Sequence, residues 1–489
     1  MAELADTHEQ SAPSASKLIT PDVEQALVRK IDIHVLPGVI WLLLLSYIDR
    51  SNLGNVKVTN KDTGRDIVTE LHLSDVDWQL AISIFYIGFV FAEIPYTLLF
   101  KRAGPSRWLA RIIVSWGITA LCHGLVSNAT GLILCRFFLG LAEAGFFPGV
   151  VLYFAYWYKQ REFATRVAFF TSATALSSAF SGLLAYAIGF ANGASGLSGW
   201  RWIFIIEGIP SIVSGFSAWF LLPDFPHTAS WLTDEEKEFA AQRLSVNAPS
   251  ATRDKNFDLD EFLEVITDLH SWLINVIFFC GIVSGITLLY WLPTIILNLG
   301  FAGTLANVLT VPPWIVSWFV AVAVSWHSDK TQERIWHLIA PSSVFLLAII
   351  FFATVPPTPG AGAGFLYFTT FLATAGSASV APILWAWRAS TSKGATGTAT
   401  ALALTNTIGA CGGAISSFIF RADWAPRYVP AFAICAVLEA IAIAGMLVKH
   451  FWSDKIDILQ ERIRPRRRAL YNDKQVIDGE TKVINEEKA

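Results

Sequence analysis

Residues 136–149 read Arg136-Phe-Phe-Leu-Gly-Leu-Ala-Glu-Ala-Gly-Phe-Phe-Pro-Gly149, an apolar segment that carries one basic and one acidic side chain. The segment belongs to a longer apolar window, 130–157, which is long enough to cross a bilayer because a spanning helix needs about 20 mostly apolar residues. A charged side chain in such a helix costs about 3 kcal/mol even on the lower scales. Arg136 and Glu143 therefore require a partner or a function.

Eleven further apolar windows of similar length divide the rest of the chain, and a polar segment at 223–270 separates six windows from six. We therefore predict an all-α integral membrane protein with twelve transmembrane helices in two six-helix halves, the outline of a transporter with a central substrate path. The windows are 34–56, 78–100, 108–127, 130–157, 164–191, 202–222, 271–297, 303–326, 337–355, 362–388, 394–420 and 428–450. The predicted regions are a tail over 1–33, a half over 34–222, a central loop over 223–270, a half over 271–450 and a tail over 451–489.

The composition supports a membrane protein and excludes several other classes. Hydrophobic residues make up 54% of the 489 residues and charged residues 15%, whereas soluble domains have about 25% charged residues. About 50 of the charges fall in the tails and in two long loops, which leaves too few to cover a soluble surface. The net charge of -3 provides no basic field for nucleic acid. The nine His residues form no ligand clusters, so we expect no metal, no cofactor and no membrane enzyme.

The positions of Lys and Arg predict the orientation in the membrane. If the N-terminus is cytoplasmic, most basic loops face the cytoplasm, and an even number of helices returns the C-terminus to the same side. The residues that define this side are Lys101, Arg102, Arg107, Lys159, Arg161, Arg166, Lys330, Arg334, Lys393 and the cluster at 462–468. We also expect a short amphipathic helix under the membrane before residue 34, and contact of the Arg464–Arg468 run with anionic lipid or solvent.

Eight ionisable side chains lie inside the predicted helices, most of them in the N-terminal half. They are Asp49, Arg50, Glu93, His123, Arg136, Glu143, Glu207 and Glu439. Arg136 and Glu143 are seven residues apart, which places them on one helix face about 10.5 Å apart along the axis. Both can therefore face one neighbour. The first helix is a candidate, because its adjacent Asp49 and Arg50 point about 100° apart.

Two acids and two arginines in one place form a set that is neutral only when both acids are ionised. Protonation of an acid, or entry of a carboxylate, changes that balance and links proton binding to anion binding. A pair of structural salt bridges is the alternative, although buried pairs are weak evidence for stability. Arg also suits a bidentate grip on a carboxylate better than Lys does. We expect structural roles for Glu93, Glu207 and His123, and the sequence offers no partner for Glu439.

Four segments together resemble a known group of transporters. They are Tyr47-Ile-Asp-Arg-Ser-Asn-Leu-Gly-Asn55, Arg136-Phe-Phe-Leu-Gly-Leu-Ala-Glu-Ala-Gly-Phe-Phe-Pro148, Gly199-Trp-Arg-Trp-Ile-Phe204 and Tyr290-Trp-Leu-Pro293. These segments resemble the anion:cation symporter branch of the major facilitator superfamily, and within it the fungal allantoate permease family. The resemblance covers about residues 34–450. It implies the major-facilitator fold and a small organic anion as substrate, such as allantoate, nicotinate, pantothenate or biotin.

The resemblance also implies residue roles. It implies proton coupling for Asp49 and Glu143, carboxylate binding for Arg50 and Arg136, and positions near the substrate for Tyr47 and Asn406. The cytoplasmic loop motif of the superfamily departs from its general form in the first half, where Lys101-Arg-Ala-Gly-Pro-Ser-Arg107 lacks the acid. The second copy, Ser328-Asp-Lys-Thr-Gln-Glu-Arg334, keeps the acid.

The function that we expect is proton-coupled import of a small organic anion by alternating access, driven by the proton gradient without a cofactor. A proton antiporter that exports a metabolite or drug is one alternative, although the helix at 164–191 lacks the Gly-Pro motif typical of such antiporters. An organophosphate antiporter fits less well, because the helix at 271–297 offers no Arg. A nutrient sensor that does not transport would have the same sequence features. The resemblance suggests a monomer in a plasma membrane.

Overall fold

The computed structural model describes residues 21–247, 259–391 and 395–460, which are helical and contain no β-strand. The N-terminal half comprises α1 (Pro21–Val56), α2 (Ile67–Glu70), α3 (Asp75–Ala103), α4 (Pro105–His123), α5 (Ala129–Glu143), α6 (Phe146–Ala155), α7 (Gln160–Gly189) and α8 (Gly199–Leu221). The connection between halves carries α9 (Asp234–Asn247) and α11 (Leu259–Thr267). The C-terminal half comprises α12 (Leu269–Asn298), α13 (Gly303–Leu309), α14 (Val311–Thr331), α15 (Ile335–Thr354), α16 (Ala361–Thr391), α17 (Ala395–Ser416) and α18 (Val429–Phe451). Short 3-10 turns are Lys61–Thr63, Ala194–Gly196, Pro226–Thr228 and Ala422–Trp424.

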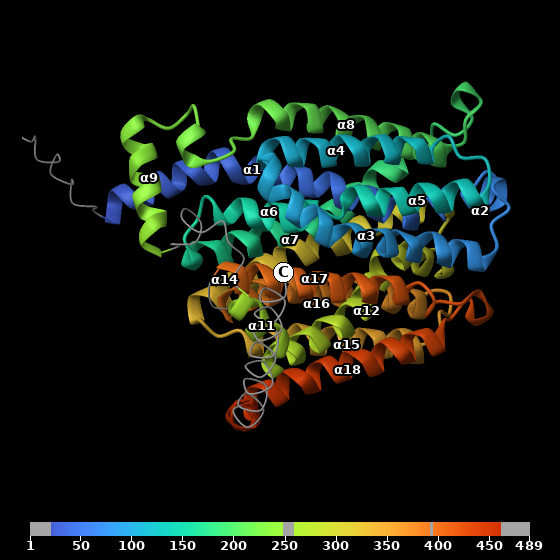
Figure 1. Cartoon of the computed structure of the whole chain (residues 1–489). Helices are drawn as coiled ribbons and strands as arrows, with labels where there is room; N and C mark the ends of the chain where they lie inside the picture. The colour runs from blue at the N-terminus through green and yellow to red at the C-terminus, as the bar shows by residue number, and fades with distance from the viewer. Residues whose placement is uncertain (1–20, 248–258, 392–394, 461–489) are drawn as a thin grey trace, which may run out of the picture.

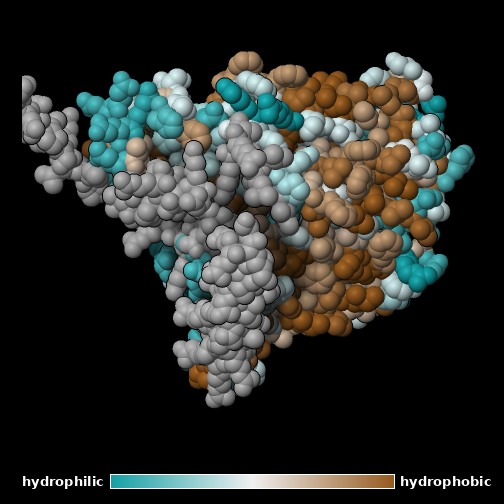
Figure 2. Space-filling model, viewed as in Figure 1, coloured by the Kyte–Doolittle hydropathy of each residue, from teal (hydrophilic) through white to brown (hydrophobic). Residues whose placement is uncertain are grey.

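The prediction of an all-helical membrane bundle is confirmed. Figure 1 shows the two halves stacked with their long helices roughly parallel; one end of the bundle carries α9 and the opposite end carries α2, and we call these the α9 end and the α2 end. Ten helical segments of the described residues are long and apolar enough to cross a membrane. The other two predicted windows correspond to α4 and α17, which pack against α8 and α3 in the same bundle. Figure 2 shows a hydrophobic surface between hydrophilic ends, as expected for a protein surrounded by lipid.

The N-terminal part of α1 corrects one prediction. Residues 21–33 do not form a separate interfacial helix, because α1 runs without a break from Pro21 to Val56. A helix of this length extends about 54 Å, well beyond the bilayer core. Residues 1–20 and 461–489, which include most of both predicted tails and the Arg464–Arg468 run, lie outside the described residues.

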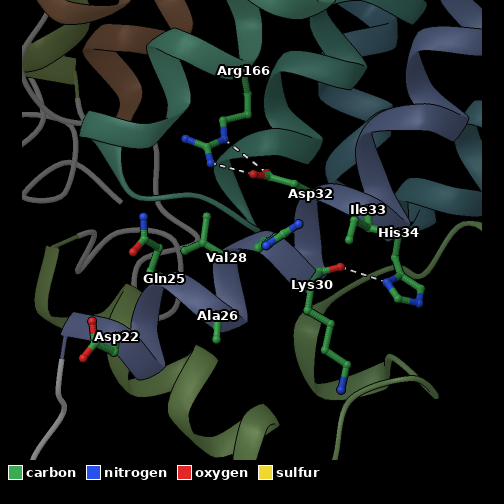
Figure 3. Close-up of a pocket in the computed structure, with 10 residues that line it drawn as sticks. Asp22, Gln25, Ala26, Val28, Lys30, Asp32, Ile33, His34 and Arg166 are labelled. Atoms are coloured by element: carbon green, nitrogen blue, oxygen red, sulfur yellow. Dashed lines mark hydrogen bonds and ion pairs between the residues drawn. The ribbon is translucent and has the colours of Figure 1, made fainter.

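Ion pairs hold the start of α1 beside α7 and α9. They join α1 to α7 and α9 and α7 to α9: Asp32 with Arg166 at 2.7 Å, Lys30 with Glu236 at 2.7 Å and Glu162 with Arg243 at 2.9 Å. Figure 3 shows Asp32 and Arg166 facing each other beside a pocket of about 770 Å³ along this part of α1. Burial raises the pKa of Glu236, but hydrogen bonds from Lys30 and Thr233 outweigh burial and leave that pKa below its ordinary value. The α9 segment is thereby fixed to the N-terminal half.

Two predicted windows contain a break in the helix. The window 130–157 becomes α5 and α6, and the window 303–326 becomes α13 and α14. Proline explains both breaks, because it has no N–H for the carbonyl four residues earlier. Pro148 lies in the first turn of α6, and Pro312 and Pro313 lie in the first turn of α14. The α5–α6 break follows directly after Glu143, so this carboxyl group lies at a helix end.

The two copies of the loop motif receive their acids from different places. In the C-terminal half, Asp329 of the motif pairs with Arg334 at 2.5 Å. In the N-terminal half, the missing acid is supplied by Asp224, just beyond α8, whose Oδ1 accepts a hydrogen bond of 2.8 Å from the backbone N–H of Ser106. A carboxylate at that position stabilises the positive N-terminal end of α4.

Glycine permits the close crossing of α3 and α5 that positions Arg136 and Glu143. A Cβ on Gly140 would lie 1.9 Å from the carbonyl oxygen of Phe85. We expect Gly140→Ala to lower the stability of the purified protein by about 1–3 kcal/mol, because α3 must move away. Gly281→Ala on α12 is the matched control, since a Cβ there meets nothing within 4 Å. Thermal unfolding in detergent measures both variants, and equal melting temperatures would contradict the close crossing.

Candidate functional site

Arg50 and Glu143 form a buried ion pair between α1 and α5. Arg50 Nε lies 2.6 Å from Glu143 Oε2, and the Ser46 hydroxyl donates to the same oxygen over 3.1 Å. Ser46 and Arg50 share one face of α1 because they are four residues apart. Glu143 is fully buried, and its Oε1 has no hydrogen-bond partner among the described residues. One carboxylate oxygen is therefore left over for a proton.

Arg136 is also fully buried, two turns before Glu143 on α5. Its Nε donates to the carbonyl of Ala81 on α3 over 3.2 Å, and its Cζ lies 5.0 Å from the centre of the Phe85 ring. Its two terminal nitrogens have no hydrogen-bond partner in the described part of the chain. Buried N–H groups without acceptors are costly, and a pair of them on one guanidinium matches the two oxygens of a carboxylate.

Aromatic side chains surround the two guanidinium groups. The Cζ of Arg50 lies 5.0 to 5.4 Å from the rings of Tyr47, Phe85 and Phe89. Phe85 therefore contacts both arginines. Next to it, the hydroxyl of Tyr86 on α3 lies 3.1 Å from the hydroxyl of Tyr290 on α12. Because α3 and α12 belong to different halves, the cluster lies at the interface between them.

Asp49 lies apart from the Arg50–Glu143 pair. The Ser211 hydroxyl of α8 donates to Asp49 Oδ2 over 3.3 Å, so Asp49 faces α8 while Arg50 faces α5. The charges of Arg136 and Glu143 still act on Asp49 electrostatically. The structure therefore brings five of the predicted residues, Tyr47, Asp49, Arg50, Arg136 and Glu143, into one region of the N-terminal half, although only Arg50 and Glu143 form an ion pair.

Asn406, the sixth predicted site residue, lies on α17 and contacts Glu93 of α3. Its Nδ2 donates to Glu93 Oε1 over 2.6 Å, and the hydroxyl of Thr407 donates to Glu93 Oε2 over 2.7 Å. Both carboxylate oxygens of Glu93 therefore accept hydrogen bonds from a helix of the other half. Glu93 is fully buried. Asn406 is thus part of a contact between the halves.

Further contacts between the halves gather at the α2 end. Nδ2 of Asn307 on α13 donates to the Thr59 hydroxyl, just after α1, over 2.8 Å. The ammonium group of Lys57 lies 3.9 Å from the centre of the Trp291 ring on α12. A Cβ on Gly54 of α1 would lie 2.7 Å from the carbonyl oxygen of Tyr290. The helices are therefore in tight contact at the α2 end.

Three other ionisable residues, His123, Glu207 and Glu439, are buried in the helices. His123 Nδ1 lies 2.8 Å from the carbonyl oxygen of Thr119, and its ring stacks on Phe204. Asn52 donates to Glu207 Oε2, and Glu439 is buried on α18. No group of three or more His, Cys, Asp or Glu residues in the described ranges is arranged to hold a metal ion.

Sequence reasoning missed several residues of the site. Ser46 was detectable, because it lies one turn before Arg50 on the same helix face. Phe85 and Tyr86 were not, since an aromatic residue in an apolar helix carries no signal that separates a site from lipid contact. Glu93 was noticed, but its partner Asn406 is 313 residues away in the chain.

Comparisons with known proteins agree with this architecture. The Major Facilitator Superfamily model matches residues 39–417. The chain is 35% identical to MFS transporter prlL of a fungal species (strain NRRL 50135), over 85% of this chain and 83% of the relative. It is 32% identical to a putative tartrate transporter of Agrobacterium vitis, over 66% of this chain and 69% of the relative.

A solved structure of the xylose transporter XylE from E. coli, in a partially occluded inward open conformation, superimposes with a TM-score of 0.65 at 15% identity. The superposition covers 85% of this chain and 97% of XylE, which supports the same fold. With a family match over most of its length and relatives that are transporters, the chain belongs to the Major Facilitator Superfamily and is a membrane transporter, not an enzyme.

Proposed function

We propose that this protein imports a small organic anion together with protons by alternating access. The observation that carries the proposal is the fully buried guanidinium of Arg136, whose two terminal nitrogens have no partner among the described residues. A substrate carboxylate supplies the acceptors that these N–H groups lack. Tyr47 and the rings around Arg50 provide an apolar wall for the rest of the substrate.

Glu143 links the proton to the anion in this proposal. While Glu143 is ionised, its ion pair of 2.6 Å keeps the Arg50 guanidinium from binding a substrate carboxylate. A proton on Glu143 removes the negative charge and releases Arg50, which then joins Arg136 in binding the carboxylate. Loss of the proton on the other side of the membrane restores the ion pair and displaces the anion. Proton and anion thereby stabilise each other, as thermodynamic linkage requires.

The contacts between the halves connect the site to alternating access. In this conformation the halves touch at the α2 end through Asn307 and Lys57, and at the site through Tyr86 and Tyr290. Rocking of the halves must break the first set and form a corresponding set at the α9 end.

The substrate class follows from the site and from the relatives. One relative is named as a putative tartrate transporter, and tartrate is a small carboxylate. Together with the motifs that resemble the allantoate permease family, this favours a small carboxylate, vitamin-like or allantoate-like anion. The same resemblance and the distribution of basic residues favour a monomer in the plasma membrane, with the α9 end and both termini in the cytoplasm.

Protonophores test the direction of transport. We expect a protonophore to suppress uptake of a labelled carboxylate into cells that express the protein, because dissipation of the gradient removes the driving force. Cells that do not express the protein serve as the control for background uptake. Increased retention of the label after protonophore addition would contradict import and favour the exporter.

A further inference from the structure

A polar seam joins α1 to α8 and contains two acids. Asp49 of α1 lies opposite Ser211 of α8, and three residues later Asn52 lies opposite Glu207. The order of the partners reverses between the helices, so the helices are antiparallel along the seam. Asp49 and Glu207 are therefore about one helical turn apart, or roughly 5 Å of helix rise.

Both acids are buried and neither forms an ion pair in the described part of the chain. Asp49 is 3% exposed and Glu207 is 4% exposed. Asp49 accepts a hydrogen bond from Ser211, and Glu207 accepts one from Asn52 through Oε2. Oε1 of Glu207 is buried and has no hydrogen-bond partner among the described residues. Burial of an ionised carboxylate with an unpaired oxygen costs free energy. Burial of the protonated form costs much less.

The charged groups around the two acids do not neutralise both of them. Arg136 and Glu143 of α5 act on Asp49 with opposite signs, and Glu207 adds a further negative charge. From α4, the neighbouring titratable side chain is His123, which packs on Phe204 of α8. Two like charges one turn apart in this setting cannot both persist without a large cost. We infer that Asp49 and Glu207 form one shared proton-binding site across the α1–α8 seam, in addition to Glu143.

This shared site changes the charge of the candidate substrate site, a step that rests on the proposed function. With Asp49, Glu143 and Glu207 all ionised, the two arginines leave a net charge of one negative unit, which repels an anion. One proton on the Asp49–Glu207 pair makes the set neutral and removes the repulsion. Protonation of the Asp49–Glu207 pair therefore removes the repulsion of the anion. Protonation of Glu143 then frees Arg50 to bind that anion.

The seam continues as a row of hydrogen bonds toward the α2 end. The Ser181 hydroxyl of α7 donates to Asn52 Oδ1 over 3.2 Å, and Asn55 Nδ2 donates to Ser181 over 2.7 Å. Asn307 of α13 then contacts the Asn55 carbonyl over 3.4 Å. Polar atoms of these residues therefore extend from Glu207 toward the α2 end, where the two halves are in contact.

Infrared spectroscopy of the purified protein in lipid tests the shared site without any substrate. The readout is the C=O stretching band of buried protonated carboxyl groups, recorded while the pH is changed. We expect Glu207→Gln and Asp49→Asn each to move the midpoint of this band to lower pH by about one unit, because the remaining acid has lost its negative neighbour. The double variant should lose the Asp49–Glu207 component of this titration and keep any component that belongs to Glu143.

Glu439→Gln is the matched control, because Glu439 is also buried, is 2% exposed and has one unpartnered oxygen. It should remove its own band and leave the midpoint of the Asp49–Glu207 titration in place. Size-exclusion profiles select folded protein for every variant. A Glu207→Gln midpoint equal to wild type, an equal shift in Glu439→Gln, or a double variant whose band titrates as the wild type does would overturn the inference. Failure of the wild type to accumulate anion would instead reject the proposed import, and the infrared titration would still decide the shared site.

Discussion

Replacement of Glu143 by Gln abolishes anion accumulation driven by an acid-outside pH gradient, and exchange of labelled for unlabelled anion persists. Gln has nearly the same shape and can still accept from Arg50 Nε and Ser46, so the helices stay together. Gln cannot bind or release a proton, so anion accumulation is no longer coupled to the proton gradient. We expect accumulation to fall at least about tenfold, because the ratio supported by one unit of pH through one proton is tenfold.

Proteoliposomes with a fixed internal volume measure both activities on the same preparation. Glu439→Gln is the control, since it removes a buried carboxyl group on α18 outside the Arg50–Glu143–Arg136 site. Unchanged accumulation by Glu143→Gln would remove Glu143 from the coupling role. Loss of accumulation and exchange together would show that Glu143 is needed for binding or folding instead, and size-exclusion profiles separate these two cases.

Replacement of Arg136 by Lys raises the apparent substrate constant for uptake by about 10- to 100-fold, because hydrogen bonds to charged groups contribute about 1.5–3 kcal/mol. Lys keeps the positive charge, so its effect on Asp49 and Glu143 is retained. It cannot present two parallel N–H groups to a carboxylate, which is what the free terminal nitrogens of Arg136 offer. The shorter ammonium group also loses its contact with Phe85.

Concentration-dependent uptake at fixed pH measures this change. Arg388→Lys is the control, because Arg388 is also a buried arginine but lies on α16, with Thr405 accepting its Nε–H over 3.1 Å. A wild-type substrate constant in Arg136→Lys would mean that Arg136 has a structural role. In that case its hydrogen bond to Ala81 would be the interaction that matters.

The helical content and the division into halves could be predicted from the sequence, because the length and apolarity that a membrane span requires are properties of local composition. Pro148 and Pro312, which cause the breaks, were visible in the sequence, but we predicted a continuous helix across each of them. The extension of α1 beyond the membrane was not predictable, since its partners in α7 and α9 are remote in the chain.

The sequence by itself identified the charges that matter, because a charge in an apolar window is costly wherever the helix packs. It could not decide which charges pair, because that depends on the rotation of each helix against its neighbours. Only the tertiary structure places Arg50 against Glu143, turns Asp49 toward α8 beside Glu207, and leaves the terminal nitrogens of Arg136 without partners. The physical reason is that a rotation of about 100° about the helix axis, the step of one residue, redirects a side chain to another helix, and packing across the whole bundle fixes that rotation.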